Sequence, residues 1–211
     1  MDAPVAAAIV AGCFAAIGWV ASYIFTSISN RLSLRRAAAI AHIEKQLGEL
    51  YGPLAFLVYE GRDTFDELLH ALGRDYIFDA DDTISDEDLK LWLFWAENDF
   101  LPRNLRIKTL LSEKSHLLFD SKMIDSYLSF LHHHNSWMIQ HLRWQKEGVT
   151  YSWHSRTNWP AQFEEDVLQA FSALQEEHSR LILRPATSRD STIALLPIVR
   201  LKAWVQRRRK S

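Results

Sequence analysis

The sequence has few of the residues that make turns or cross-links. Its 211 residues include only 7 glycines, 6 prolines and one cysteine, Cys13. So few turn formers over this length argue against an all-β fold and favour long helices. A single cysteine excludes an internal disulfide framework and a metal site built from several thiolates, and it agrees with a reducing compartment.

Charged side chains are absent from the segment between Pro4 and Ile28. A helix that crosses a bilayer needs roughly 20 mostly apolar residues, because each residue rises ~1.5 Å through a hydrocarbon core of ~30 Å. The segment is apolar on all sides, whereas a helix of a small soluble domain has one polar face. Residues 1–30 are therefore predicted to form a transmembrane anchor, and no later segment is long and apolar enough to form another.

A cleaved signal peptide and a lipoprotein signal are the alternatives for this segment. A secretory signal has a basic stretch before a run of ~7–15 apolar residues. Here only Met1, Asp2 and Ala3 precede a longer run. Small residues lead to Cys13, as they do at a lipidated cysteine, but the chain stays apolar beyond it. Both alternatives are disfavoured.

Basic residues follow the anchor and set its predicted orientation. Arg31, Arg35 and Arg36 come after the apolar segment, whereas only Asp2 is charged before it. Lys and Arg near a membrane helix stay in the cytoplasm. The N-terminus is therefore expected outside and residues from 31 onward inside, at a bacterial inner membrane.

Small residues repeat at four-residue spacing within the anchor, at Ala8, Gly12 and Ala16. Such a stripe lets two membrane helices approach closely, and a homo-oligomer is one interpretation. The abundance of alanine in this segment explains the pattern equally well.

Apolar residues recur at three- and four-residue steps through the rest of the chain, which predicts helices. Gly52-Pro53 and Pro102 are expected to interrupt them, Gly73 to end one and Ser85 to cap the next. The fold class is therefore all-α, with a cytoplasmic bundle of about five or six helices over residues 31–183. The predicted helices are Ser33–Leu50, Leu54–Leu72, Ser85 to before Pro102, Leu105–Phe119, Met123–Gln145 and Trp159–Leu183.

An acidic segment that starts at Asp79 and a run of three histidines, His132 to His134, contain residue types that bind metals. Neither has the ligand spacing of a known metal site. Counted from Asp79, an EF-hand loop would need a glycine where Ile84 stands and an acid where Lys90 stands. The residues four after His132, His133 and His134 are not metal ligands. A solvated acidic loop and a mixture of packed and surface histidines are predicted, with no metal and no cofactor.

Aromatic and hydrogen-bonding residues alternate between Tyr151 and Pro160, in a segment without glycine. Loops often carry binding function, and these residue types make interaction hot spots. The alternative is that the tryptophans are core residues and the polar groups cap the following helix. The candidate binding loop is Tyr151, Trp153, His154, Arg156, Asn158 and Trp159, with Trp137, His141 and Trp144 as candidate pocket neighbours.

The last segment, residues 184–211, carries eight basic residues against one acid, Asp190, although the whole chain has a net charge of -2. As a helix after Pro197 it would place apolar residues and Trp204 on one side and arginines on the other, which is the pattern of an interfacial helix on anionic lipid. Packing on the bundle is an alternative, and nucleic-acid binding is disfavoured because no recognition motif accompanies it. The candidate membrane-surface residues are Arg35, Arg36, Arg200, Lys202, Trp204, Arg207, Arg208 and Arg209.

These patterns predict a single-pass membrane-anchored helical protein that acts by protein or lipid interaction, as an adaptor, sensor or membrane effector. Its partners would be the bilayer through Pro4–Ile28, anionic lipid at the basic C-terminal tail, and an unknown protein or a second copy of the chain. No catalytic residue is assigned, because no nucleophile elbow, phosphate loop or carboxylate pair is present. The alternative is an enzyme of unfamiliar type with a site around residues 151–160, where Tyr151, His154, Arg156 and His141 would act.

Overall fold

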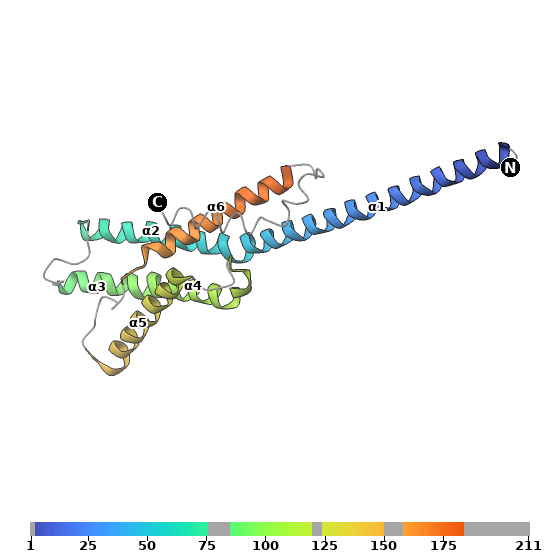
Figure 1. Ribbon diagram of the computed structural model, residues 1–211. Coiled ribbons are helices and arrows are strands. Elements are labelled where there is room, and N and C mark those ends of the chain that lie inside the picture. Colours follow the sequence, from blue (N-terminus) through green and yellow to red (C-terminus); the bar gives the residue numbers. More distant parts are fainter. Residues whose placement is uncertain (1–2, 76–84, 120–123, 150–157, 184–211) are drawn as a thin grey trace. The chain divides into compact units, whose positions relative to one another are not determined.

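The computed structural model describes residues 3–75, 85–119, 124–149 and 158–183, with side chains from residue 12 onward (Figure 1). Every regular element in these ranges is helical, so the predicted all-α class is confirmed. The chain divides into two compact units, residues 1–43 with 177–211 and residues 44–176. The second unit packs as a helical bundle.

Helix α1 runs without a break from Ala3 to Gln46. The predicted anchor and most of the predicted helix Ser33–Leu50 are therefore parts of one helix, about 66 Å long at 1.5 Å per residue. Its large apolar side chains between Phe14 and Ile28 are exposed, and Phe14 is 72% exposed. Among the described residues, this is the one helix that is long and apolar enough to cross a membrane.

The last two turns of helix α6, which covers Ala161–Leu183, belong to the same unit as α1 up to Ile43. The guanidinium of Arg36 donates a hydrogen bond to the main-chain carbonyl of Leu181. The last four carbonyls of a helix have no partner within it, and a cation there also opposes the negative end of the helix dipole. Arg36 thus fastens the end of α6 to α1.

The sequence Gly52-Pro53 does not break the helix, contrary to the prediction. A π-helical turn, Leu47–Tyr51 (η1), follows α1 directly and leads into helix α2, Gly52–Leu72. The amide of Gly52 donates to the carbonyl of Leu47, five residues earlier instead of four. This wider turn accommodates the proline ring, which would clash in the interior of a regular α-helix, at the first turn of α2.

Pro102 is accommodated in the same way. Helix α3, Asp86–Trp95, continues through a π-helical turn, Ala96–Phe100 (η2), into helix α4, Leu101–Glu113. The amide of Leu101 donates to the carbonyl of Ala96, again five residues back. The predicted helix end before Pro102 is therefore wrong, because this proline lies in the first turn of α4.

Both predicted caps beside the acidic segment are confirmed. The hydroxyl oxygen of Ser85 accepts a hydrogen bond from the amide of Asp88 at 3.1 Å, and the acids of this first turn lie at the positive end of the helix dipole. Gly73 has a φ of 68°, which a glycine adopts without strain, and its amide donates to the carbonyl of His70. The acidic loop between these caps, residues 76–84, lies outside the described residues.

Helix α4 ends earlier than predicted, and a 3-10 turn, Ser115–Leu117 (η3), follows it. The side-chain amide of Gln46 donates to the carbonyl of Leu117 at 2.9 Å, which satisfies a buried polar side chain. The hydroxyl of Tyr51 accepts a hydrogen bond from the amide of Phe119 at 2.9 Å. Side chains at the end of α1 and in η1 therefore hold the chain where it leaves α4.

The two remaining helices begin and end close to their predicted positions. Helix α5 covers Asp125–Glu147 and is capped by Gly148, which has a left-handed φ of 64°. Helix α6 begins directly after Trp159-Pro160, because proline suits the start of a helix. Its buried side chains include Phe163 and Val167, which anchor its first turns in the bundle.

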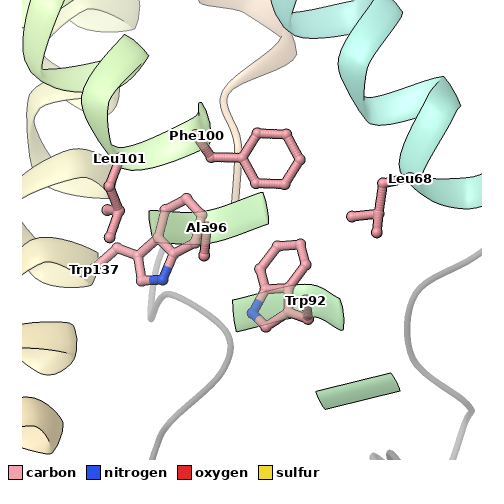
Figure 2. Packing of buried hydrophobic residues seen from close by; sticks show 6 residues of the cluster. All are labelled: Leu68, Trp92, Ala96, Phe100, Leu101 and Trp137. Atoms are coloured by element: carbon pink, nitrogen blue, oxygen red, sulfur yellow. The ribbon is translucent and has the colours of Figure 1, made fainter. Parts of the chain in front are cut away.

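One part of the core is built mainly from rings. Figure 2 shows the indole groups of Trp92 and Trp137 with the ring of Phe100 between α2 and α5. The ring centroids of the two tryptophans are 5.6 Å apart, and Phe100 lies 5.6 Å from Trp92. The cluster consists of Leu68, Trp92, Ala96, Phe100, Leu101 and Trp137.

Candidate functional site

The residues that the sequence singles out fall into three groups. Trp137, His141 and Trp144 lie on α5, and Asn158 and Trp159 lie just before α6. The remaining members of the candidate binding loop, Tyr151, Trp153, His154 and Arg156, lie outside the described residues.

The three candidate pocket neighbours belong to the packed face of α5. Trp137 is buried in the ring cluster, and Trp144 packs against the edge of that cluster. His141 is buried, and its ring centroid lies 5.4 Å from that of Trp144. In the described part of the chain these three side chains build core.

His141 faces one acid at the edge of this face. Its Nε2 lies 3.4 Å from Oε1 of Glu97 in η2, and Gln145 donates to the same oxygen at 3.0 Å. Burial lowers the pKa of His141, and the carboxylate of Glu97 partly opposes that shift. A neutral imidazole can donate one N–H to this carboxylate, so the contact links α5 to η2 without a buried charge.

Trp159 is partly open to solvent. It is 36% exposed, and its ring packs edge-on against Phe130 and His133, with centroid distances of 5.7 Å and 5.5 Å. The indole N–H donates to Oε1 of Glu164 at 2.5 Å. Its neighbour Asn158 is exposed. This is the point where the described structure reaches the candidate loop.

His133 joins the two aromatic groups that the sequence singles out. Its ring lies 5.7 Å from Trp137 on one side and 5.5 Å from Trp159 on the other, measured between centroids. The structure therefore brings Trp137 and Trp159 together through a buried histidine. Sequence reasoning placed His133 only in a mixed set of packed and surface histidines, because its contact with Trp159 joins segments distant in the chain.

Glu164 has a role that the sequence did not reveal. One of its carboxylate oxygens accepts the indole N–H of Trp159, and the other lies 2.5 Å from Nε of Arg62 on α2. Two different donors on one carboxylate fix its position. Glu164 thus ties the exposed tryptophan and α2 to the first turn of α6.

A second missed feature is a buried arginine between α2 and α4. Arg103 forms an ion pair with Asp99, lies 3.5 Å from a carboxylate oxygen of Glu60, and donates to the hydroxyl of Thr64 at 2.8 Å. Gly61 leaves room for it, since a Cβ there would lie 3.3 Å from the guanidinium. Polar partners on two helices set their register.

His134 is a buried polar side chain of α5 whose Nδ1 lacks a hydrogen-bond partner. It is 1% exposed, and its ring stacks on Phe130 with centroids 6.3 Å apart. Burial lowers its pKa to about 4, with smaller contributions from Lys108 and His133. His134 is therefore neutral and packs against Phe130 as an aromatic ring does.

Metal ligands do not gather in the described structure. Within the described ranges, no group of three or more His, Cys, Asp or Glu is placed to hold an ion. The three buried histidines of α5 contact rings and, for His141, one carboxylate.

The candidate membrane-surface residues are also divided. Arg35 is exposed, whereas Arg36 is half-buried and bonded to Leu181. The six others, Arg200, Lys202, Trp204, Arg207, Arg208 and Arg209, lie outside the described residues.

Of the candidate binding loop, the described residues that are open to solvent are Asn158 and, in part, Trp159. Comparisons with protein-family models, with curated proteins and with solved structures find no match to this chain.

Proposed function

We propose that the chain is a single-pass membrane protein whose helical domain acts at the inner membrane surface by binding a partner, as an adaptor, sensor or membrane effector. The observation that carries this proposal is the first part of α1, where large apolar side chains are exposed over a stretch without charge.

Water is an unfavourable surrounding for that stretch. Phe14, Trp19 and Phe25 are each more than two-thirds exposed, and exposed apolar surface costs roughly 25 cal/mol per Å². A bilayer removes this cost and leaves no main-chain group unpaired, because α1 is continuous. Trp19 and Tyr23 stack toward the cytoplasmic end, where aromatic side chains favour the headgroup level.

The basic residues after the apolar stretch support an orientation with the N-terminus outside. Arg31 and Arg35 are exposed, so they are accessible to headgroups at the inner face. Partner binding is assigned to the surface at Trp159, because that indole is held by a hydrogen bond and is still partly exposed. The partner is a second protein or a second copy of the chain.

Cysteine accessibility in intact cells tests the anchor and its direction. In a Cys13→Ala background, an Asp2→Cys variant is expected to react with a membrane-impermeant maleimide, whereas Lys90→Cys reacts only after the membrane is permeabilised. Alkaline extraction is expected to leave the protein in the membrane pellet. Reaction of Lys90→Cys in intact cells would reverse the orientation, and release by alkali would refute the anchor.

A further inference from the structure

We infer that the exposed face of α2 binds a basic amphipathic helix of a partner protein. This face, the α2 surface, consists of Phe56, Tyr59, Asp63, Asp66 and Glu67, which are all exposed. The inference rests on the proposed function as a partner-binding protein. It adds a second contact surface and names the chemistry of the partner.

The five side chains lie along one stripe of the helix. They follow one another at steps of three or four residues, and residues at these spacings are neighbours on a helix surface. The buried side chains of α2, which include Leu54, Val58 and Leu68, lie on the opposite side. The α2 surface is therefore the outer face of a helix whose inner face is already packed.

Two rings form the apolar part of the α2 surface. Phe56 is 67% exposed, and Tyr59, three residues further along, is 55% exposed. A single exposed apolar residue is common on soluble proteins, but these two are neighbours on the same helix face. Aromatic side chains contribute strongly to an interface when a partner buries them.

Three carboxylates form the charged part of the α2 surface. In the described part of the chain, Asp63, Asp66 and Glu67 form no ion pair and no side-chain hydrogen bond. Asp63 is three residues from Asp66 and four from Glu67, so these like charges are neighbours and repel one another. Carboxylates stabilise a helix in its first turn, and α2 has none there. These three acids therefore do not stabilise α2 itself.

The bases next to this surface are already bound to other acids. Arg62 is paired with Glu164, and Arg74 lies 3.1 Å from a carboxylate oxygen of Asp88. A partner that brings Lys or Arg would supply the missing positive charge and would relieve the repulsion among the carboxylates. Anionic lipid and nucleic acid, in contrast, would be repelled.

The arrangement of the two parts indicates the form of the partner. Tyr59 and Asp66 are seven residues apart, which is about 10.5 Å along the helix. A complementary helix carries an apolar side chain that packs on the two rings and, about two turns away, bases that face the carboxylates. Within the described ranges the acids do not converge on a metal site, so a row of bases suits them better than one ion.

Photocrosslinking from the α2 surface tests this inference. The full chain is placed in nanodiscs of neutral phosphatidylcholine, with the photoreactive residue benzoylphenylalanine in place of Tyr59. The probe is a synthetic helical peptide of leucine and lysine whose leucines lie on one face. Irradiation is expected to join this peptide to the chain, whereas a peptide with glutamate in place of every lysine should not be joined. High salt should lower the yield.

Two triple variants separate the charge of this surface from the total charge. Asp63→Asn, Asp66→Asn and Glu67→Gln together should lower the yield on the order of tenfold, because each exposed charge pair changes an affinity by roughly 1.5- to 5-fold. The matched control, which should keep the yield, changes three exposed acids elsewhere: Glu113→Gln, Glu165→Gln and Glu176→Gln. A helical circular dichroism signal confirms that each variant is folded.

A second position for the photoreactive residue tests the location of the surface. Phe94 is an exposed ring on α3, and benzoylphenylalanine in its place should join less of the lysine peptide than at position 59. Equal yields at the two positions, equal capture of the two peptides, or equal yields in the two triple variants would refute the inference. A crosslink from position 59 to the chain itself or to a second copy, formed without peptide, would overturn it by assigning another occupant.

Failure of the proposed anchor gives a different result. A chain that does not enter the nanodiscs refutes the anchor, and the same capture experiment in detergent then still tests the α2 surface. A chain that enters the nanodiscs but captures neither peptide refutes the inference and leaves the anchor in place.

Discussion

The indole rings of Trp92 and Trp137 stack with their planes 16° apart and their centroids separated by 5.6 Å, although one comes from α3 and the other from α5. Both side chains are buried. The pair joins the two helices at the ring cluster. Removing either ring should therefore lower the stability of the fold without removing a binding surface.

Replacement of Trp137 by alanine is expected to lower the free energy of unfolding by about 3–5 kcal/mol, because a large side chain leaves a cavity among rings. Thermal or denaturant unfolding of the protein in detergent measures this. Trp137→Phe, which keeps a ring, should cost markedly less. If the alanine variant unfolded like the wild type, the described burial of Trp137 would be wrong.

Replacement of Trp159 should affect partner binding more than stability, because this side chain is partly exposed whereas Trp137 is buried. We expect Trp159→Ala to abolish in-cell crosslinking to the partner while the helical circular dichroism signal is retained. Phe94→Ala removes another exposed ring, on α3, and should leave the crosslink unchanged. Retention of the crosslink in both variants would show that Trp159 is not part of the binding surface.

Acid should destabilise the protein through His134. Its pKa is about 4 in the folded chain and about 6.5 when unfolded, so the unfolded state binds the proton more readily. Stability is therefore full above pH 6.5 and falls as the pH drops toward 4, by at most about 3 kcal/mol. The lowered pKa of His141 acts in the same direction.

Chemical denaturation at several pH values measures this dependence. His134→Leu should flatten it, whereas His132→Leu changes an exposed histidine on the same helix and should not. An unchanged slope in His134→Leu would assign the acid sensitivity to other groups.

Arg103 is expected to be costly to remove. In Arg103→Ala the carboxylates of Asp99 and Glu60 lose their shared cation, and loss of one partner of a buried ion pair costs about 3–5 kcal/mol. Arg106→Ala removes an exposed base from the same helix and should stay within about 0.5 kcal/mol of the wild type. Equal unfolding midpoints for the two variants would contradict this role.

Two glycines of the first π-helical region give a matched test. A Cβ on Gly52 would lie 2.5 Å from the carbonyl oxygen of Leu47, so Gly52→Ala must distort the turn and should destabilise the protein by about 1–3 kcal/mol. Gly48 has nothing within 4 Å of that position, and Gly48→Ala should stabilise the helix by about 0.5–1 kcal/mol. Shifts of the unfolding midpoint in opposite directions from the wild type would support the π-helical geometry, and equal midpoints for the two variants would contradict it.

Local chemistry explains the features that the sequence predicts well. The cap at Ser85 and the left-handed Gly73 depend on neighbours within four residues, so they are visible in the sequence. The helix periodicity and the start of α6 after Pro160 are equally local.

Features that depend on distant segments are not visible in this way. A proline inside a helical pattern normally predicts that the helix ends there. At Pro53 and Pro102 a π-helical turn keeps the helix continuous instead, and the sequence pattern does not indicate this turn. Arg103 and Glu164 each have a partner on α2, Thr64 and Arg62 respectively, which lies far from them in the chain. The composition of the candidate loop indicated Trp159. Its connection to Trp137 through His133 became visible only in the structure.

The two π-helical turns also have a meaning for comparisons with other chains. Each turn holds one residue more than a regular α-helix would use to reach the same point. A relative with an uninterrupted α-helix would therefore align with a one-residue gap just before Pro53 or Pro102. Deleting one residue there in this chain should turn the wide turn into a regular α-helical turn and leave the faces of the following helix close to their present directions.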